Sequence, residues 1–106
     1  MIKSLKIAGQ DYEVKTFKGG EAQNLWGWTD TEKKAIHINS AKGTQKARTM
    51  TVFHEAMHGI VEEYGINATL SENEEELIVR ILEVAVPLFL RDNKQFTKEL
   101  IKIIDV

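Results

Sequence analysis

The sequence contains no cysteine, only one proline and no long hydrophobic run. The lack of cysteine excludes disulfide bonds, thiolate zinc sites and thiol catalysis, and it is compatible with a reducing compartment. No segment approaches the roughly 20 apolar residues that a membrane-spanning helix needs. Lys3 and Lys6 interrupt the apolar residues near the N-terminus, so no secretory signal is expected. These absences predict a cytoplasmic protein with no membrane partner.

Net charge is also low. The 106 residues include 14 Lys and Arg and 16 Asp and Glu, which give a net charge of -2. A nucleic-acid-binding domain usually carries a strongly basic surface, so no nucleic-acid partner is expected. The length suits a single domain, and 42% hydrophobic residues suffice for a core. We therefore expect residues 1–106 to form one globular domain, while its oligomeric state is not indicated.

Alternating apolar and polar residues in the first 40 positions predict two β-hairpins. In the first, SLKIA and YEVKT flank the turn residues Gly9, Gln10 and Asp11. In the second, LWGWT and KAIHIN flank the polar residues 30–33. Two consecutive hairpins predict a small antiparallel sheet.

From residue 44 onward, apolar residues recur every three to four positions, which predicts helices. The first helix should begin at the N-cap Thr44 and end before Gly65. The second should begin after Ser71, which forms a capping box with Glu74, and should kink at Pro87. A short third helix should follow residue 93. A sheet followed by helices predicts an α+β fold with the helices packed on one face of the sheet.

Residues 54–58 of the first predicted helix read His-Glu-Ala-Met-His. Residues four apart lie on one face of a helix, so His54 and His58 can bind the same zinc ion. Glu55 lies about 100° around the helix, beside the metal, where it can take a proton from a zinc-activated water. The alternative is a pair of hydrogen-bonded core histidines with Glu55 at a solvated edge. The apolar residues around the motif favour the metal site.

A catalytic zinc site of this kind needs a third protein ligand. In the metzincin pattern a glycine and a third histidine follow the motif, but Val61 and Tyr64 occupy those positions here. The remaining option is a glutamate at the start of the second predicted helix, where the candidates are Glu72, Glu74, Glu75 and Glu76.

Helix geometry sorts these four glutamates. The helix dipole explains Glu72, the capping box occupies Glu74, and Glu76 shares its face with other charged residues that should point into solvent. Glu75 lies above the apolar residues that should pack inward, where a carboxylate needs a partner or a metal. Glu75 is therefore the expected third ligand, with Glu74 and Glu76 as the alternatives.

With this motif on one helix, a candidate glutamate on the next and a small sheet before them, the sequence resembles the ImmA/IrrE-like metallopeptidases. The resemblance is to their short phage and mobile-element versions, and it covers the segments 36–41, 49–66 and 73–93. It implies one minimal zincin-like domain with a gluzincin-type site for one Zn2+ held by His54, His58 and Glu75. It also implies hydrolysis of peptide bonds with Glu55 as general base, and a protein or peptide substrate, a repressor in several members.

Four further residues are candidates for substrate contact. His37 could line the cleft and steady an oxyanion, or it could be an exposed strand histidine. Tyr64 could donate to the transition state, or it could only pack at the helix end. Trp26 and Trp28 have strand spacing, so they could lie on a hairpin edge that binds an extended peptide or on the core face of the sheet.

The sequence leaves a second function open. The same fold could hold zinc and dock a partner protein without turnover. Structural zinc sites usually have four protein ligands, whereas three good candidates are present here, which favours a peptidase. A metal-free interaction domain would require the motif to be accidental.

Overall fold

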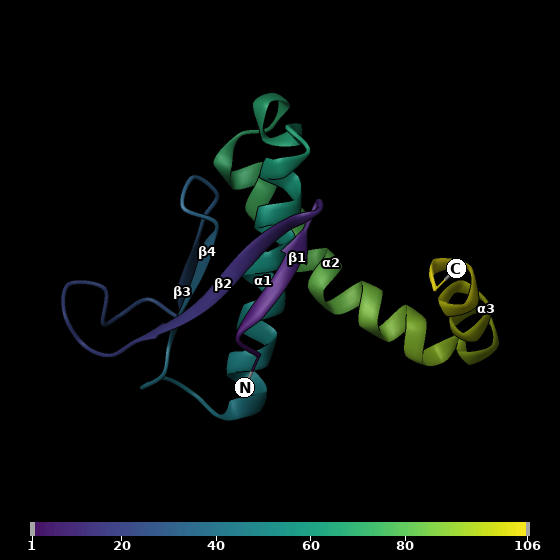
Figure 1. The fold of residues 1–106 in the computed structure, drawn as a ribbon, viewed down its shortest axis with the longest axis horizontal. Helices are drawn as coiled ribbons and strands as arrows, with labels where there is room; N and C mark the ends of the chain where they lie inside the picture. Colours follow the sequence, from purple (N-terminus) through teal and green to yellow (C-terminus); the bar gives the residue numbers. More distant parts are fainter. Residues whose placement is uncertain (1, 106) are drawn as a thin grey trace.

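A computed structural model, described over residues 2–105, shows a four-stranded sheet followed by three helices (Figure 1). The strands are β1 (Ser4–Ile7), β2 (Gln10–Phe17), β3 (Gly27–Asp30) and β4 (Ala35–Asn39). The helices are α1 (Gln45–Glu63), α2 (Glu72–Asp92) and α3 (Lys94–Ile104), with a 3₁₀ turn, η1 (Ile66–Thr69), between α1 and α2. The predicted α+β fold is confirmed.

Both predicted hairpins form, but the sheet that joins them is mixed. β1 pairs antiparallel with β2 and β3 pairs antiparallel with β4, whereas β2 and β4 lie side by side in parallel. The prediction of a wholly antiparallel sheet is wrong at this one junction. The connection 18–26 carries the chain to the far edge, so the second hairpin docks through its second strand and the order is β1-β2-β4-β3. β3 is therefore an edge strand with one unpaired side.

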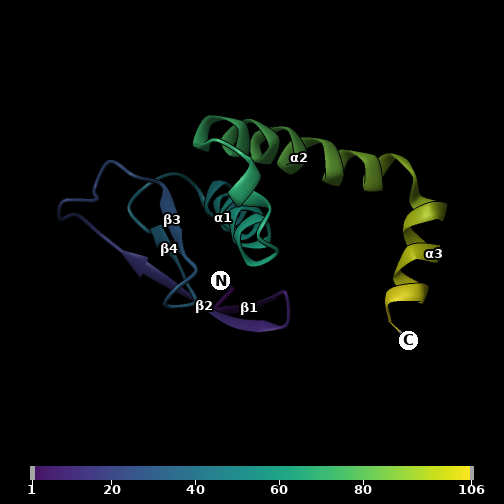
Figure 2. The ribbon, with the colours of Figure 1, turned by 90° about the horizontal axis from the view of Figure 1, so that it is seen from above.

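The core lies between the sheet and α1. Alternation along the strands directs every second side chain to one face, and the residues that meet there with α1 are Ile7, Tyr12, Val14, Ile36, Ile38 and Val52. α2 packs on the side of α1 that faces away from the sheet (Figure 2). Because α1 is the middle layer, its second face is free to carry polar groups that meet α2.

Both predicted helix starts are confirmed. Thr44 Oγ1 accepts a hydrogen bond from the Ala47 amide at 3.1 Å, and Ser71 and Glu74 form a complete capping box. α1 ends at Glu63 with Tyr64 as its C-cap, and Gly65 then adopts the left-handed conformation with φ 73°. These caps fix the registers of α1 and α2, and with them the side chains that face one another.

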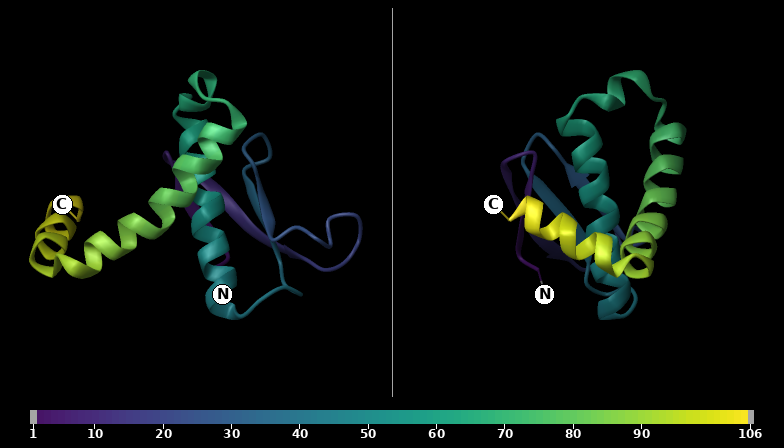
Figure 3. Two further views of the ribbon diagram at one scale, coloured as in Figure 1. Left: turned by 180° about the vertical axis from the view of Figure 1, so that it is seen from behind. Right: turned by 90° about the vertical axis from the view of Figure 1, so that its right-hand side faces the viewer.

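The second half of α2 and all of α3 project from the body formed by the sheet and α1 (Figure 3). α2 remains helical through Pro87 to its last residue. Val79 is the one buried residue of α2, and α3 contains none. No helix in residues 2–105 is both long enough and apolar enough to cross a membrane.

Candidate metal centre

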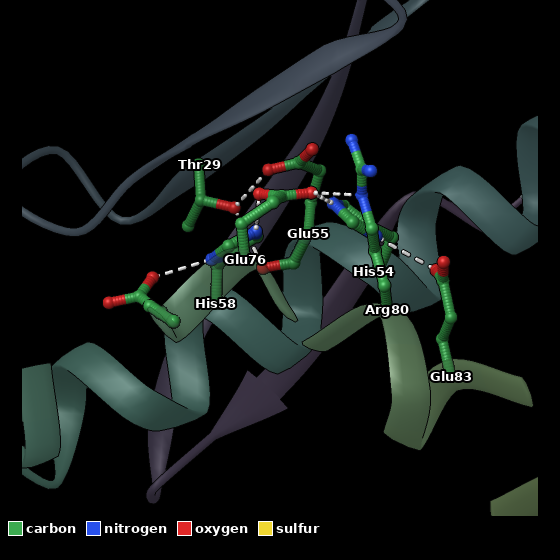
Figure 4. Close-up of polar contacts among 8 residues, drawn as sticks. Thr29, His54, Glu55, His58, Glu76, Arg80 and Glu83 are labelled. Atoms are coloured by element: carbon green, nitrogen blue, oxygen red, sulfur yellow. Dashed lines mark hydrogen bonds and ion pairs between the residues drawn. The ribbon is translucent and has the colours of Figure 1, made fainter. Parts of the chain in front are cut away.

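His54 and His58 lie in the middle of α1, on the face that meets α2 (Figure 4). Their spacing of four residues brings the two rings together, with centroids 4.9 Å apart. Their side chains are only 19% and 15% exposed. The two histidines therefore point together into a narrow, mostly buried space between the two helices.

Glu76 of α2 joins the two histidines from the other side of this space. His54 Nε2 lies 3.1 Å from Glu76 Oε1, and His58 Nε2 lies 3.0 Å from Glu76 Oε2. One ligand atom from each of these three residues lies within 4.8 Å of the other two. Two imidazole nitrogens and one carboxylate oxygen are the protein ligands of the His₂Glu class of catalytic zinc sites. The residues present therefore fit a zinc ion, and we call His54, His58 and Glu76 the metal cluster.

This arrangement favours Glu76 over the predicted Glu75 as the third ligand, and it shows that Glu76 faces the two histidines rather than solvent. The face of α2 that meets α1 carries Glu76, Val79 and Glu83, at helical spacings of three and four. Val79 is fully buried, whereas Ile78, one of the apolar residues near Glu75 that were expected to pack inward, is 38% exposed. Helix phase was misjudged because the contact is mainly polar: pairing with the histidines compensates for burying the carboxylates.

Two further glutamates contact the outer ring nitrogens of the histidines. His54 Nδ1 lies 2.8 Å from Glu83 Oε2, and His58 Nδ1 lies 2.5 Å from Glu75 Oε2. A carboxylate on one imidazole nitrogen fixes the orientation of the ring and of the other nitrogen. Glu75 is therefore part of the site, but on the outer side of His58. Glu83 was not predicted, although its position two turns after Glu76 was the signal that could have found it.

The charges of the cluster govern the protonation of its members. Burial would lower the pKa of His58, but the hydrogen bond with Glu75 and the nearby carboxylates outweigh it, so this pKa is raised. Burial would raise the pKa of Glu76, but the two histidines and Arg80 outweigh it, so this pKa is lowered. Glu76 is thus held as an anion, and a metal ion must compete with a proton for His58.

Glu55 is the one buried carboxylate in the described part of the chain, with 8% of its surface exposed. Burial is the largest influence on its pKa and raises it, while a hydrogen bond from Thr29 opposes the shift. Thr29 Oγ1 lies 2.9 Å from Glu55 Oε1 and 2.7 Å from the Glu55 carbonyl oxygen (Figure 4). Thr29 was not singled out in the sequence, because only the docking of β3 on α1 brings it to Glu55.

Three other predicted contact residues do not lie at the metal cluster. His37 stacks on Trp28 with ring centroids 4.3 Å apart. Because Thr29 points toward α1, the adjacent Trp28 points to the opposite face of the sheet. His37, which stacks on Trp28, lies on that same face. Tyr64 is the C-cap of α1 and is 67% exposed. These positions favour the alternatives considered for both residues, a strand histidine away from the site for His37 and a place at the helix end for Tyr64.

Trp26 does reach the site, from the loop before β3 rather than from the strand. Buried Asn39 holds this loop, since its Nδ2 donates to the carbonyl oxygens of Gln23 and Leu25 at 2.9 Å each. Its backbone amide also donates to the Trp26 carbonyl at 2.9 Å. Trp26 is 46% exposed, and its ring packs beside Gly43, where even a Cβ atom would lie 2.7 Å from it. Trp26 is thus an exposed ring in a fixed position.

Cavities flank the metal cluster on both sides. The first has a volume of about 420 Å³ and lies between an apolar wall that includes Trp26 and Met50 and a polar wall that includes His54 and Glu55. The second, of about 400 Å³, lies beside His58 and is lined mostly by acidic side chains. A bound chain could therefore extend to either side of the cluster.

No family model, curated protein or solved structure matches the chain. The resemblance to the ImmA/IrrE-like metallopeptidases therefore stays a prediction from the motif and the order of elements. What the site can do has to follow from its own residues.

Replacing Glu76 with alanine is expected to weaken zinc binding more than replacing Glu75. Glu76→Ala removes a ligand atom, whereas Glu75→Ala leaves all three and only frees the ring of His58. Loss of such an outer carboxylate typically lowers metal affinity by about 10- to 100-fold, and we expect Glu76→Ala to exceed that range. The measurement is zinc titration in competition with a chromophoric chelator.

Glu74→Ala is the matched control for these two variants. It removes the capping-box acid from the same helical turn and leaves the metal cluster intact. Zinc affinity should stay unchanged, with a small loss of thermal stability. A larger loss of affinity in Glu75→Ala than in Glu76→Ala would restore Glu75 as the third ligand.

Proposed function

We propose that the protein is a zinc-dependent peptidase in which Glu55 acts as the general base. The single observation that supports it best is the position of Glu55: a buried carboxylate beside the metal cluster, tied through Thr29 to an edge strand. A proton acceptor and a set of metal ligands supply the groups for zinc-dependent hydrolysis, and an unpaired strand edge can bind an extended peptide by strand addition.

His54, His58 and Glu76 would hold the ion, while Glu75 and Glu83 would keep the two imidazole rings oriented. Zinc, when bound, would polarise the scissile carbonyl and lower the pKa of water. The group found among residues 2–105 has three members, which is the usual number of protein ligands in catalytic rather than structural zinc sites. This number favours turnover over a purely structural role.

Glu55 takes a proton from the attacking water and passes it to the nitrogen of the leaving amine. Burial raises the pKa of this carboxyl above its usual range. The pKa thus moves toward neutral pH, which suits a group that must first accept a proton and then donate it. The hydroxyl of Thr29 holds one oxygen of the carboxylate. The other oxygen is then available for the water.

The edge strand β3 supports a peptide as the substrate. The Asn39 amide donates to the Trp26 carbonyl, and backbone groups alternate along an antiparallel pair. Gly27 and Thr29 therefore direct their backbone N–H and C=O groups to the open edge. An extended peptide that added to this edge would pass close to Glu55. A repressor substrate and a cytoplasmic location remain predictions from the sequence.

The function is tested by peptide cleavage with zinc-loaded protein. The purified protein is given one equivalent of zinc and incubated with an unstructured peptide library, and the products are identified by mass spectrometry. We expect cleavage that stops when a chelator removes the zinc and returns when zinc is restored. If one zinc binds and no peptide is cut, the peptidase proposal fails and a zinc-containing docking module is favoured. Failure to bind zinc would contradict both.

A further inference from the structure

The projecting part of the molecule carries a large exposed apolar surface. We call residues 81–105, the second half of α2 together with α3, the arm. Nine of its large apolar side chains are between 37% and 72% exposed, and the most exposed are Val84, Ile103 and Ile104. The views in Figure 2 and Figure 3 agree that neither the sheet nor α1 covers the end of the arm.

The arm is nevertheless ordered by its own contacts. At the corner between α2 and α3, the Thr97 hydroxyl lies 2.7 Å from the Leu90 carbonyl oxygen, and Asn93 Nδ2 donates to the Phe89 carbonyl at 2.8 Å. The rings of Phe89 and Phe96 meet edge to face with centroids 5.6 Å apart. The apolar surface is therefore preformed, so a partner would not have to order it.

The size of this surface matches one half of a stable interface. A half-exposed side chain of this kind leaves roughly 80–100 Å² open, so the arm presents on the order of 800 Å² of apolar surface. The largest patch on an ordinary monomer is about 300–600 Å². A standard protein interface buries about 800 Å² on each partner. The nine side chains together reach that area, but helical spacing puts them on more than one side of α2 and α3, so a partner must pack around the arm to cover them.

We propose that the arm packs against the arm of a second copy of this chain. It carries four Lys or Arg and four Asp or Glu, so its net charge is zero. A membrane-surface helix depends on basic residues that attract anionic lipids, and such an excess is lacking here. A second copy brings an identical apolar surface, and two arms of zero net charge do not repel each other overall.

A groove at the base of the arm is the proposed binding site for the partner's α3. It has a volume of about 440 Å³, its apolar wall includes Met50, Val84 and Leu88, and charges of both signs surround it. Ile103 and Ile104 of the second copy have the size and polarity to fill it. Met50 also lines the cavity beside His54. Met50 therefore connects the proposed interface with the cavity beside the candidate site.

The test is the mass of the full chain in solution, measured by sedimentation equilibrium over a range of micromolar concentrations. Wild type is expected to have twice the mass of one chain. Ile103→Glu should raise the dimer dissociation constant by at least ~100-fold, because two-fold symmetry introduces two buried charges. Val84→Glu tests the α2 side of the arm in the same way. Circular dichroism confirms that each variant is folded.

Ile66→Glu is the matched control, because Ile66 is 50% exposed but lies in η1, outside the arm. This variant should remain a dimer. The proposal is overturned if wild type is a monomer at all concentrations, if the dimer survives both arm substitutions, or if monomeric protein instead binds lipid vesicles through the arm. None of these results depends on zinc or cleavage, so the interface can fail while the peptidase proposal stands.

Discussion

Replacing His58 with alanine is expected to abolish tight zinc binding. His58 offers one of the three ligand atoms of the metal cluster, and no other histidine of the chain lies near enough to replace it. The loss of zinc affinity should exceed the ~10- to 100-fold reduction in metal affinity that removal of an outer carboxylate causes. It is measured by competition with a chromophoric chelator, supported by metal analysis after dialysis.

His37→Ala is the control for this experiment. His37 is also partly buried in the structure, yet it stacks on Trp28 on the opposite face of the sheet. Its replacement should leave zinc affinity within a small factor of wild type. Thermal melting of both variants separates lost ligation from lost folding. If zinc binds His58→Ala as tightly as wild type, the cluster is not the metal site.

Replacing Glu55 with glutamine is expected to remove peptide cleavage while zinc remains bound. Glutamine has nearly the same shape, and its side-chain oxygen can still accept the hydrogen bond from Thr29. It cannot take a proton from water at neutral pH. General-base catalysis usually contributes about 10²- to 10⁴-fold, so the rate of cleavage should fall by that factor. Zinc stoichiometry, measured on the same sample, should stay at one per chain.

Glu62→Gln is the matched substitution on the same helix. Burial also raises the pKa of Glu62, but this carboxylate lies outside the metal cluster, on the cavity beside His58, so the cleavage rate at saturating peptide should stay close to wild type while KM can change. A variant Glu55→Gln that cleaves as fast as wild type would exclude Glu55 as the base. Equal reductions of the cleavage rate in Glu55→Gln and Glu62→Gln would indicate instead a general effect of the negative charge on α1.

The histidines, glutamates and strand edge of the site differ in how far the sequence could predict them. His54, Glu55 and His58 lie on one helix, so their relative positions follow from helical geometry once Thr44 and Gly65 define its ends. The paired hairpins and the capping box at Ser71 are local in the same sense. Their contacts span a few residues, and the residue types involved have strong conformational preferences.

The choice among the glutamates of α2 depends on the rotation of that helix against α1. The sequence-based prediction took the apolar side as the contact face, which favoured Glu75 over Glu76. In the structure Glu75, Glu76 and Glu83 all contact the histidines, but only Glu76 meets the Nε2 atoms of both, and Val79 is the one fully buried residue on this side of α2. A polar contact face violates the usual pattern, and only the partner charges on α1 explain it.

What the sequence by itself determined is the set of elements and the spacing of His54, Glu55 and His58, because these follow from short-range geometry. Only the tertiary structure decided which carboxylate meets the histidines, which strand becomes the open edge and where Thr29 lies. These features depend on how a mixed sheet and two helices dock. Glu75 and Glu76 are neighbours on α2, and the way this helix docks on α1 places Glu76 at the Nε2 atoms of both histidines and Glu75 at the outer nitrogen of His58 alone.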